Sequence, residues 1–180
     1  RKGRDAFFCP HEPSGVDMVS GGARGIDTAG HHGALQHGAT AVVPPRGIYQ
    51  FRWRQPARCR VEGGQWCIVG QFPPSSGWKT KHALIRNHTI VALGDATLAV
   101  EPRDRGGTWR SSRATLRAGK PLFLMNPSGE KWKERGAEAL CRSGAKKLSC
   151  NAPPGPDQFE ELVERAQTCD EEKQSPLFGS

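Results

Sequence analysis

Two glycine-rich turns, each between an apolar stretch and a helical pattern, are the part of this sequence best suited to chemistry. The first is Ser-Gly-Gly-Ala-Arg-Gly at residues 20–25, and the second is Arg-Gly-Gly-Thr at residues 105–108. Glycine lets the backbone approach a ligand closely, and the start of the following helix presents free N–H groups with a partial positive charge. Arg24 adds a guanidinium that can bind a phosphate through two hydrogen bonds. Together these features predict a phosphate site.

Taken alone, the first turn is a weak motif. It is neither a dinucleotide fingerprint nor a Walker A loop, since no Gly-Lys-Ser/Thr follows it. A plain strand-to-helix turn explains it equally well. Two other features can also be explained without any ligand. Arg110, Arg113 and Arg117 share a helix face that is either solvated or a track for phosphates, and the pair His31-His32 is expected to be structural or to face solvent.

The elements that must position these turns alternate along the chain. Strands are predicted at 16–20, 39–43, 66–69, 96–100, 122–125 and 147–149, and helices at 26–36, 80–93, 108–118 and 131–142. This alternation predicts an α/β fold with a mostly parallel sheet. In such sheets ligands bind at the carboxyl ends of the strands. Both glycine turns fall there, so we expect them to converge on one edge.

The charge is unevenly distributed over the 180 residues. The net charge is +8, but residues 151–180 hold seven acids and two bases, whereas residues 1–150 hold 24 bases and 11 acids. A basic body points to a polyanionic or phosphate partner. We expect a loop or remnant at 1–14, the main domain at 15–150, and a linker with an acidic amphipathic helix at 151–180. That helix would dock on the body or on a second subunit.

Several classes of protein are excluded by composition. No apolar run approaches the ~18–20 residues that span a bilayer, and residues 1–8 hold no apolar stretch of signal-peptide length. The six cysteines lack C-x-x-C spacing, so we expect reduced cytosolic thiols, no metal and no cofactor. Residues 45–65 are harder to assign, because the aromatic residues Tyr49, Phe51 and Trp53 are interleaved there with Arg46, Arg52 and Arg54.

Four ordered segments resemble the DNA-processing protein A family (DprA, also called Smf). Residues 20–35 carry Ser-Gly-Gly-Ala-Arg-Gly-Ile-Asp-Thr-Ala followed by His and Gly-Ala-Leu. Residues 71–74 are similar to the family's Glu-Phe-Pro-Pro, residues 86–93 to its Arg-Asn-Arg block, and residues 98–108 to its Glu and Gly-Ser/Thr turn. Residues 118–123 and 143–145 fit its later part. The resemblance covers about residues 15–150.

The resemblance implies a Rossmann-like domain that binds single-stranded DNA in a basic pocket, without catalytic residues. It implies a cytoplasmic role in DNA processing, natural transformation and recombination, with the RecA recombinase as a partner and with dimerisation. The residues it would place at the DNA phosphates are Ser20, Gly21, Arg24, Gly25, Arg86, Asn87, Gly106, Gly107 and Thr108. Aromatic residues stack on bases in single-strand sites, and the candidates here are Phe72, Trp78 and Trp109.

Some positions depart from the family pattern. The usual first strand and Gly-x-Arg loop have no match in residues 1–14, and Gln71 and His88 replace a glutamate and an arginine. We therefore expect a truncated or diverged relative. Two alternatives stay open: a module that binds a nucleotide, and a LOG-type hydrolase of nucleoside monophosphates. The latter carries a glutamate three residues after the threonine of its turn, where this chain has Ser111.

Overall fold

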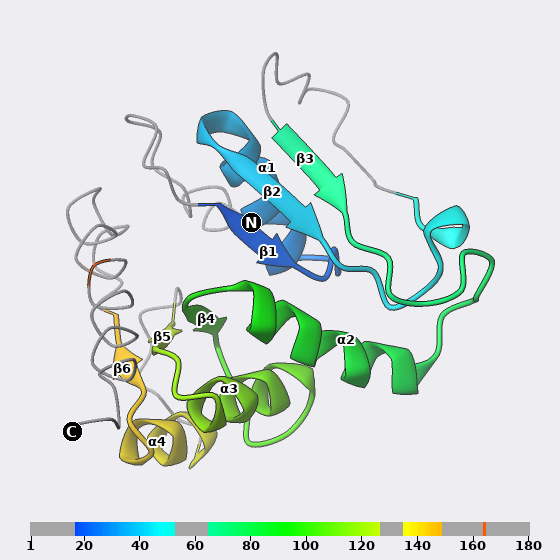
Figure 1. Ribbon diagram of the computed structural model, residues 1–180. Coiled ribbons are helices and arrows are strands. Elements are labelled where there is room, and N and C mark those ends of the chain that lie inside the picture. Colours follow the sequence, from blue (N-terminus) through cyan, green and yellow to red (C-terminus); the bar gives the residue numbers. More distant parts are fainter. Residues whose placement is uncertain (1–16, 53–64, 127–134, 149–163, 165–180) are drawn as a thin grey trace, which may run out of the picture. The chain divides into compact units, whose positions relative to one another are not determined.

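The computed structural model describes residues 17–52, 65–126, 135–148 and 164, which belong to two compact units (Figure 1). The first unit extends to Gly94 and the second begins at Asp95. The domain limits expected near residues 15 and 150 lie outside the described residues. So does the expected acidic helix, except for Glu164, which is helical. No helix in the described part of the chain has the length and apolar character needed to cross a bilayer.

The first unit is a three-stranded parallel sheet with two helices. Its elements are β1 (Met18–Ser20), α1 (Ile26–His37), β2 (Ala39–Val42), the 3-10 helix η1 (Ile48–Gln50), β3 (Gln65–Ile68) and α2 (Thr80–Leu93). The strand order is β1-β2-β3, and Ser20, Val42 and Ile68 are in register at the carboxyl edge. Helix α1 packs against β1 and β2, and α2 contacts β1. The turns that follow these strands are thereby gathered at one edge.

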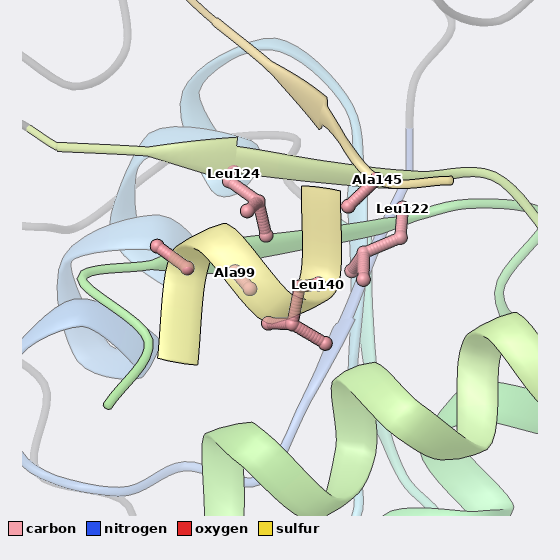
Figure 2. Close-up of a cluster of buried hydrophobic side chains, with 6 residues drawn as sticks. Ala99, Leu122, Leu124, Leu140 and Ala145 are labelled. Atoms are coloured by element: carbon pink, nitrogen blue, oxygen red, sulfur yellow. The ribbon is translucent and has the colours of Figure 1, made fainter. Parts of the chain in front are cut away.

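The second unit repeats this alternation. It comprises β4 (Thr97–Val100), α3 (Gly107–Arg117), β5 (Leu122–Met125), α4 (Arg135–Arg142) and β6 (Lys146–Lys147), with parallel strands in the order β4-β5-β6. All of β5 is buried, as an apolar run of this kind predicts for a central parallel strand. Its core joins side chains from β4, β5 and α4 with that of the residue just before β6 (Figure 2): Ala99, Leu122, Leu124, Ala137, Leu140 and Ala145.

The predicted α/β fold with parallel strands is confirmed, and α2 has the predicted bounds. Most other elements end within a residue or two of the expected position, which is the usual uncertainty at fraying ends. The last strand occupies Lys146–Lys147, so it starts one residue and ends two residues before the predicted 147–149. Residues 131–134, which we expected to open α4, lie outside the described residues. The sequence did not predict η1, because a single 3-10 turn has no periodicity.

Candidate nucleic-acid interface

The first glycine turn is shaped by two left-handed glycines and by the first turn of α1. Gly22 has φ 65° and Gly25 has φ 94°, a region that residues with a Cβ rarely occupy. The backbone N–H of Ala23 donates to Oδ2 of Asp27 over 3.1 Å, and the Thr28 hydroxyl donates to the Ala23 carbonyl over 2.7 Å. The helix start therefore holds the turn in a defined shape.

A buried arginine reaches this turn from α2. The Arg86 side chain is 9% exposed, and its Nη1 donates to the Val43 carbonyl over 3.3 Å. A Cβ atom on Gly21 would overlap the guanidinium, so a glycine is required for this close approach. The Nε of Arg86 is buried and has no hydrogen-bond partner among the described residues. A cation with spare donor capacity thus lies directly against the turn.

Two opposing effects act on the pKa of Arg86. Burial lowers the pKa of Arg86, because a low-dielectric surrounding disfavours the charged form. The nearby Asp27 carboxylate raises the pKa again by stabilising the cation. Arginine stays protonated in proteins, so the guanidinium remains a charged donor. The carboxylate that supports it also places one negative charge beside the turn.

The other residues predicted at this edge lie on the same elements. Ser20 ends β1 half-buried, and its carbonyl accepts from the Val43 N–H over 2.8 Å. Asn87 follows Arg86 on α2 and is half-buried. Arg24 lies in the turn itself, exposed, and forms no ion pair with any described residue. The structure therefore brings Gly21 and Arg86 together and leaves Arg24 facing solvent.

The second turn belongs to the second unit. Gly106 caps α3 with φ 102°, and Gly106, Gly107 and Thr108 are all exposed. Just before it, Glu101 has φ 45°, a left-handed conformation that is uncommon for a residue with a side chain. These features suit an open helix start after β4. That this turn and the first one converge on a single phosphate site stays a prediction.

The three predicted stacking residues have different surroundings. The Phe72 ring is stacked on His82, with centroids 3.9 Å apart and an interplanar angle of 10°. Trp109 packs against the core of the second unit, and the Arg113 guanidinium lies 6.0 Å from its ring centroid. Trp78 is 54% exposed. Trp78 is thus the most accessible of the three, whereas Trp109 has a packing role in the second unit.

His31 is a buried residue of α1 that contacts β2. Its Nδ1 lies 2.6 Å from Oγ1 of Thr40, and that hydroxyl donates to the Met18 carbonyl over 3.0 Å. Because the single hydroxyl proton is used in the second bond, His31 must donate from Nδ1. Desolvation lowers the pKa of His31 to about 4, partly offset by Asp27 and assisted by His32. The structural reading of His31 therefore agrees with its surroundings.

Two further observations concern the arginines of α3 and possible metal sites. The three arginines on one face of α3 are exposed: Arg110, Arg113 and Arg117. Within the described ranges, no group of three His, Cys, Asp or Glu side chains is arranged to hold a metal ion.

Sequence reasoning missed two residues that shape this edge. Asp27 was assigned no role, although its position in the first turn of α1 is typical of a carboxylate that supports a loop. Phe51 was not a candidate either, yet its ring lies against Gly22, where a Cβ would be 3.2 Å from the Phe51 Cζ. The alternation of aromatic residues with arginines was the only signal that could have found Phe51.

The order of these motifs along the chain is that of a known family. The profile described as DNA recombination-mediator protein A matches residues 5–153. The chain belongs to this family. The match also includes residues 5–14, which precede residue 15, where we expected the main domain to begin. Among curated DprA relatives, protein Smf of Escherichia coli is 33% identical over 137 residues, which cover 73% of this chain and 36% of Smf.

Other relatives agree in sequence and in fold. The DNA processing protein DprA of Streptococcus pneumoniae is 28% identical over 131 residues, which cover 72% of this chain and 46% of that protein. Its crystal structure superposes with a TM-score of 0.66 at 24% identity, covering 89% of this chain and 54% of the other. The chain thus spans well under half to about half the length of these DprA relatives.

A second DprA structure is also similar in fold. The DprA of Helicobacter pylori, whose structure concerns a single-stranded DNA binding mode, has a TM-score of 0.62 at 23% identity, covering 82% of this chain and 65% of the other. A molybdenum cofactor binding protein of Rippkaea orientalis reaches only 0.50 at 16% identity, over 87% of this chain and 98% of the other. The Rossmann-like fold class is therefore shared beyond the DprA family.

Proposed function

We propose that this DprA-family chain binds single-stranded DNA through the turn at residues 20–25. The same proposal gives it a role in DNA processing during transformation and recombination, and hence a cytoplasmic place of action. The family membership supports the proposal, as does the single-stranded DNA binding mode described for the H. pylori relative. Because the chain spans 36% of Smf and 46% of the pneumococcal DprA, the activity of the whole protein is part of the proposal.

The observation that carries the proposal is the buried Arg86 against Gly21. A guanidinium that is 9% exposed and has a free Nε is costly unless an acceptor completes its hydrogen bonds. A phosphate at the turn would supply that acceptor and a compensating negative charge. Charge-assisted bonds of this kind are about twice as strong as neutral ones.

The remaining residues of the turn would then contact the phosphate backbone of the bound DNA. Arg24, exposed in the same turn, would bind a phosphate in solvent, and the N–H groups at the start of α1 would add their partial positive charge. We also assign the turn at Gly106, Gly107 and Thr108 and the side chain of Asn87 to the DNA path. None of these groups reads a base edge, so binding should be insensitive to sequence.

A binding role is favoured over a hydrolytic one. The LOG-type reaction requires a carboxylate at the position of Ser111, and a serine cannot replace it as an acid or base. The partners expected from the family, RecA and a second copy of the chain, are the further part of this proposal. Size-exclusion chromatography with light scattering, alone and with RecA, tests both.

The direct test measures the binding of a labelled dT oligonucleotide by fluorescence anisotropy over a series of salt concentrations. We expect log Kd to rise linearly with log salt, because phosphate neutralisation releases counterions. Arg24→Ala should weaken binding to all base sequences alike and reduce the salt slope by about 0.7, which corresponds to one phosphate contact on a single strand.

The control is Arg142→Ala, which removes an exposed arginine from the last turn of α4. It should leave affinity and slope close to those of the original protein. Absence of salt-dependent binding, or equal effects of the Arg24 and Arg142 variants, would show that the turn is not a DNA site. Release of free base from a nucleoside monophosphate would instead support the hydrolase.

A further inference from the structure

Among the described aromatic residues and arginines that follow β2, Phe51 shapes the site described above, whereas Tyr49 has no part in it. The 3-10 helix η1 presents Tyr49 with 68% of its surface exposed, and Ile48 beside it with 40%. A large aromatic ring this accessible makes no contribution to a core. Since Tyr49 is also the sole tyrosine of the chain, it can be observed without interference from another.

The backbone under Tyr49 is firmly held. The Tyr49 N–H donates to the Pro74 carbonyl over 3.0 Å, and the Gly47 N–H donates to the Ser76 carbonyl over 2.8 Å. A Cβ on Gly47 would overlap the carbonyls of Pro73 and Pro74, so the two segments are in close contact. Figure 1 shows η1 lying beside the loop that follows β3. The exposed ring therefore projects from a fixed turn.

This turn is adjacent to the phosphate site. The Phe51 ring lies against Gly22, with its Cζ 3.2 Å from the place of a Cβ there. Phe51 also closes the turn, since its N–H donates to the Ile48 carbonyl over 3.2 Å. The Cα atoms of Tyr49 and Phe51 are two residues apart and so separated by at most about 7 Å. Tyr49 is therefore within a short reach of the glycine turn.

Charge at this turn favours a polyanion. Arg46 folds over η1 with its Nη1 3.5 Å from the Gln50 carbonyl, and Arg52 is exposed immediately after Phe51. No described acidic side chain forms an ion pair with either arginine. An exposed ring between arginines, next to a phosphate site, is the combination by which proteins hold unpaired nucleotides. An apolar protein partner would not need the two cations.

We propose that Tyr49 is a base-stacking platform for single-stranded DNA, with Arg46 and Arg52 on the adjoining phosphates. The proposal rests on the proposed function, because it extends the same bound strand from the glycine turn to η1. Stacking uses the π-face that every base has, so the platform adds affinity without sequence preference. It requires a base, whereas the glycine turn requires only a phosphate.

That difference defines the experiment. Affinity is measured for a dT oligonucleotide and for an abasic oligonucleotide of equal length, with the original protein, Tyr49→Ala, Tyr49→Phe and Trp66→Ala. Trp66 is a matched control: it is 51% exposed, and it pairs with Thr40 two residues before the carboxyl edge of the sheet. Far-UV circular dichroism and thermal melting establish that each variant is folded.

We expect the original protein to prefer dT over the abasic strand. Tyr49→Ala should weaken dT binding by about fivefold or more and leave abasic binding and the salt slope unchanged. Tyr49→Phe should retain the preference, and Trp66→Ala should have no effect. In addition, the single ¹⁹F resonance of protein labelled with 3-fluorotyrosine should shift with dT and stay in place with the abasic strand.

The outcomes separate the two proposals. If the original protein binds neither strand, the proposed function fails and the platform fails with it. If it binds both strands and Tyr49→Ala keeps the preference for dT, or the fluorine resonance does not move, the platform is overturned and the glycine-turn site stands. A loss of dT affinity in Trp66→Ala equal to that in Tyr49→Ala also overturns it, since stacking would then not be specific to η1.

Discussion

Acidification should destabilise the protein through His31. The side chain is 1% exposed and its pKa is lowered to about 4, against an ordinary value of 6.5 in the unfolded chain. Because the folded state disfavours the proton, the stabilisation is complete above pH 6.5 and is lost as the pH falls from 6.5 towards 4. A lowered histidine pKa therefore predicts lower stability in acid, and not in alkali.

The size of this effect follows from the two pKa values. A difference of about 2.5 units corresponds to roughly 3 kcal/mol of unfolding free energy between neutral pH and pH below 4. At pH 5 the loss from His31 alone amounts to about 2 kcal/mol. Physically, a proton on Nε2 leaves the bond to Thr40 intact but places a charge between α1 and the sheet.

The assay is urea unfolding at pH 7.5 and pH 5.0 for the original protein and for His31→Gln, whose amide cannot titrate but can still donate to Thr40. The variant should lose about 2 kcal/mol less on acidification. His88→Gln is the control, because His88 is exposed on α2 and should change nothing. An NMR titration of the His31 ring, with a midpoint near pH 4, provides a second readout independent of the variant.

Two results would refute the reasoning. The first is an equal dependence on pH in the original protein and His31→Gln. The second is an NMR midpoint for His31 near 6.5, which would mean that the ring is hydrated in the folded state.

Two further predictions concern the glycine turn. Gly21→Ala should destabilise the protein by about 1–3 kcal/mol and weaken DNA binding, because the new methyl group displaces the Arg86 guanidinium. The control is Gly77→Ala, in open space, which should change stability by less than about 0.5 kcal/mol in urea unfolding. Equal effects of the two substitutions would contradict the close contact between Gly21 and Arg86. Asp27→Asn should raise DNA affinity at low salt about two- to fivefold while lowering stability by about 0.3–1 kcal/mol, because it removes a negative charge both from the site and from the start of α1. Anisotropy measures the affinity and urea unfolding the stability. Glu138→Gln, which removes the same kind of charge from the first turn of α4, is the control for affinity and should leave it unchanged. Unchanged affinity in Asp27→Asn would place the phosphate elsewhere.

Local patterns in the sequence were sufficient for the strands, for the α-helices and for the two glycine turns, but not for η1. Apolar runs bounded by glycine and proline predicted the strands, and the helix over 80–93 has the predicted bounds. The glycines at 22, 25 and 106 do have the left-handed backbone that such turns use. These features depend on residues close together in the chain, whose conformational preferences act before any packing is formed.

The tertiary structure decided which of these residues act together. That Arg86 is buried against Gly21, that His31 is neutral beside Thr40, and that Phe51 lies on Gly22 all depend on packing between segments distant in the chain. Burial changes the energy of a charge, and only packing determines burial. The sequence by itself therefore determined where a phosphate could approach, whereas the fold decided which cation is held there and which aromatic ring, Tyr49, is left exposed beside it.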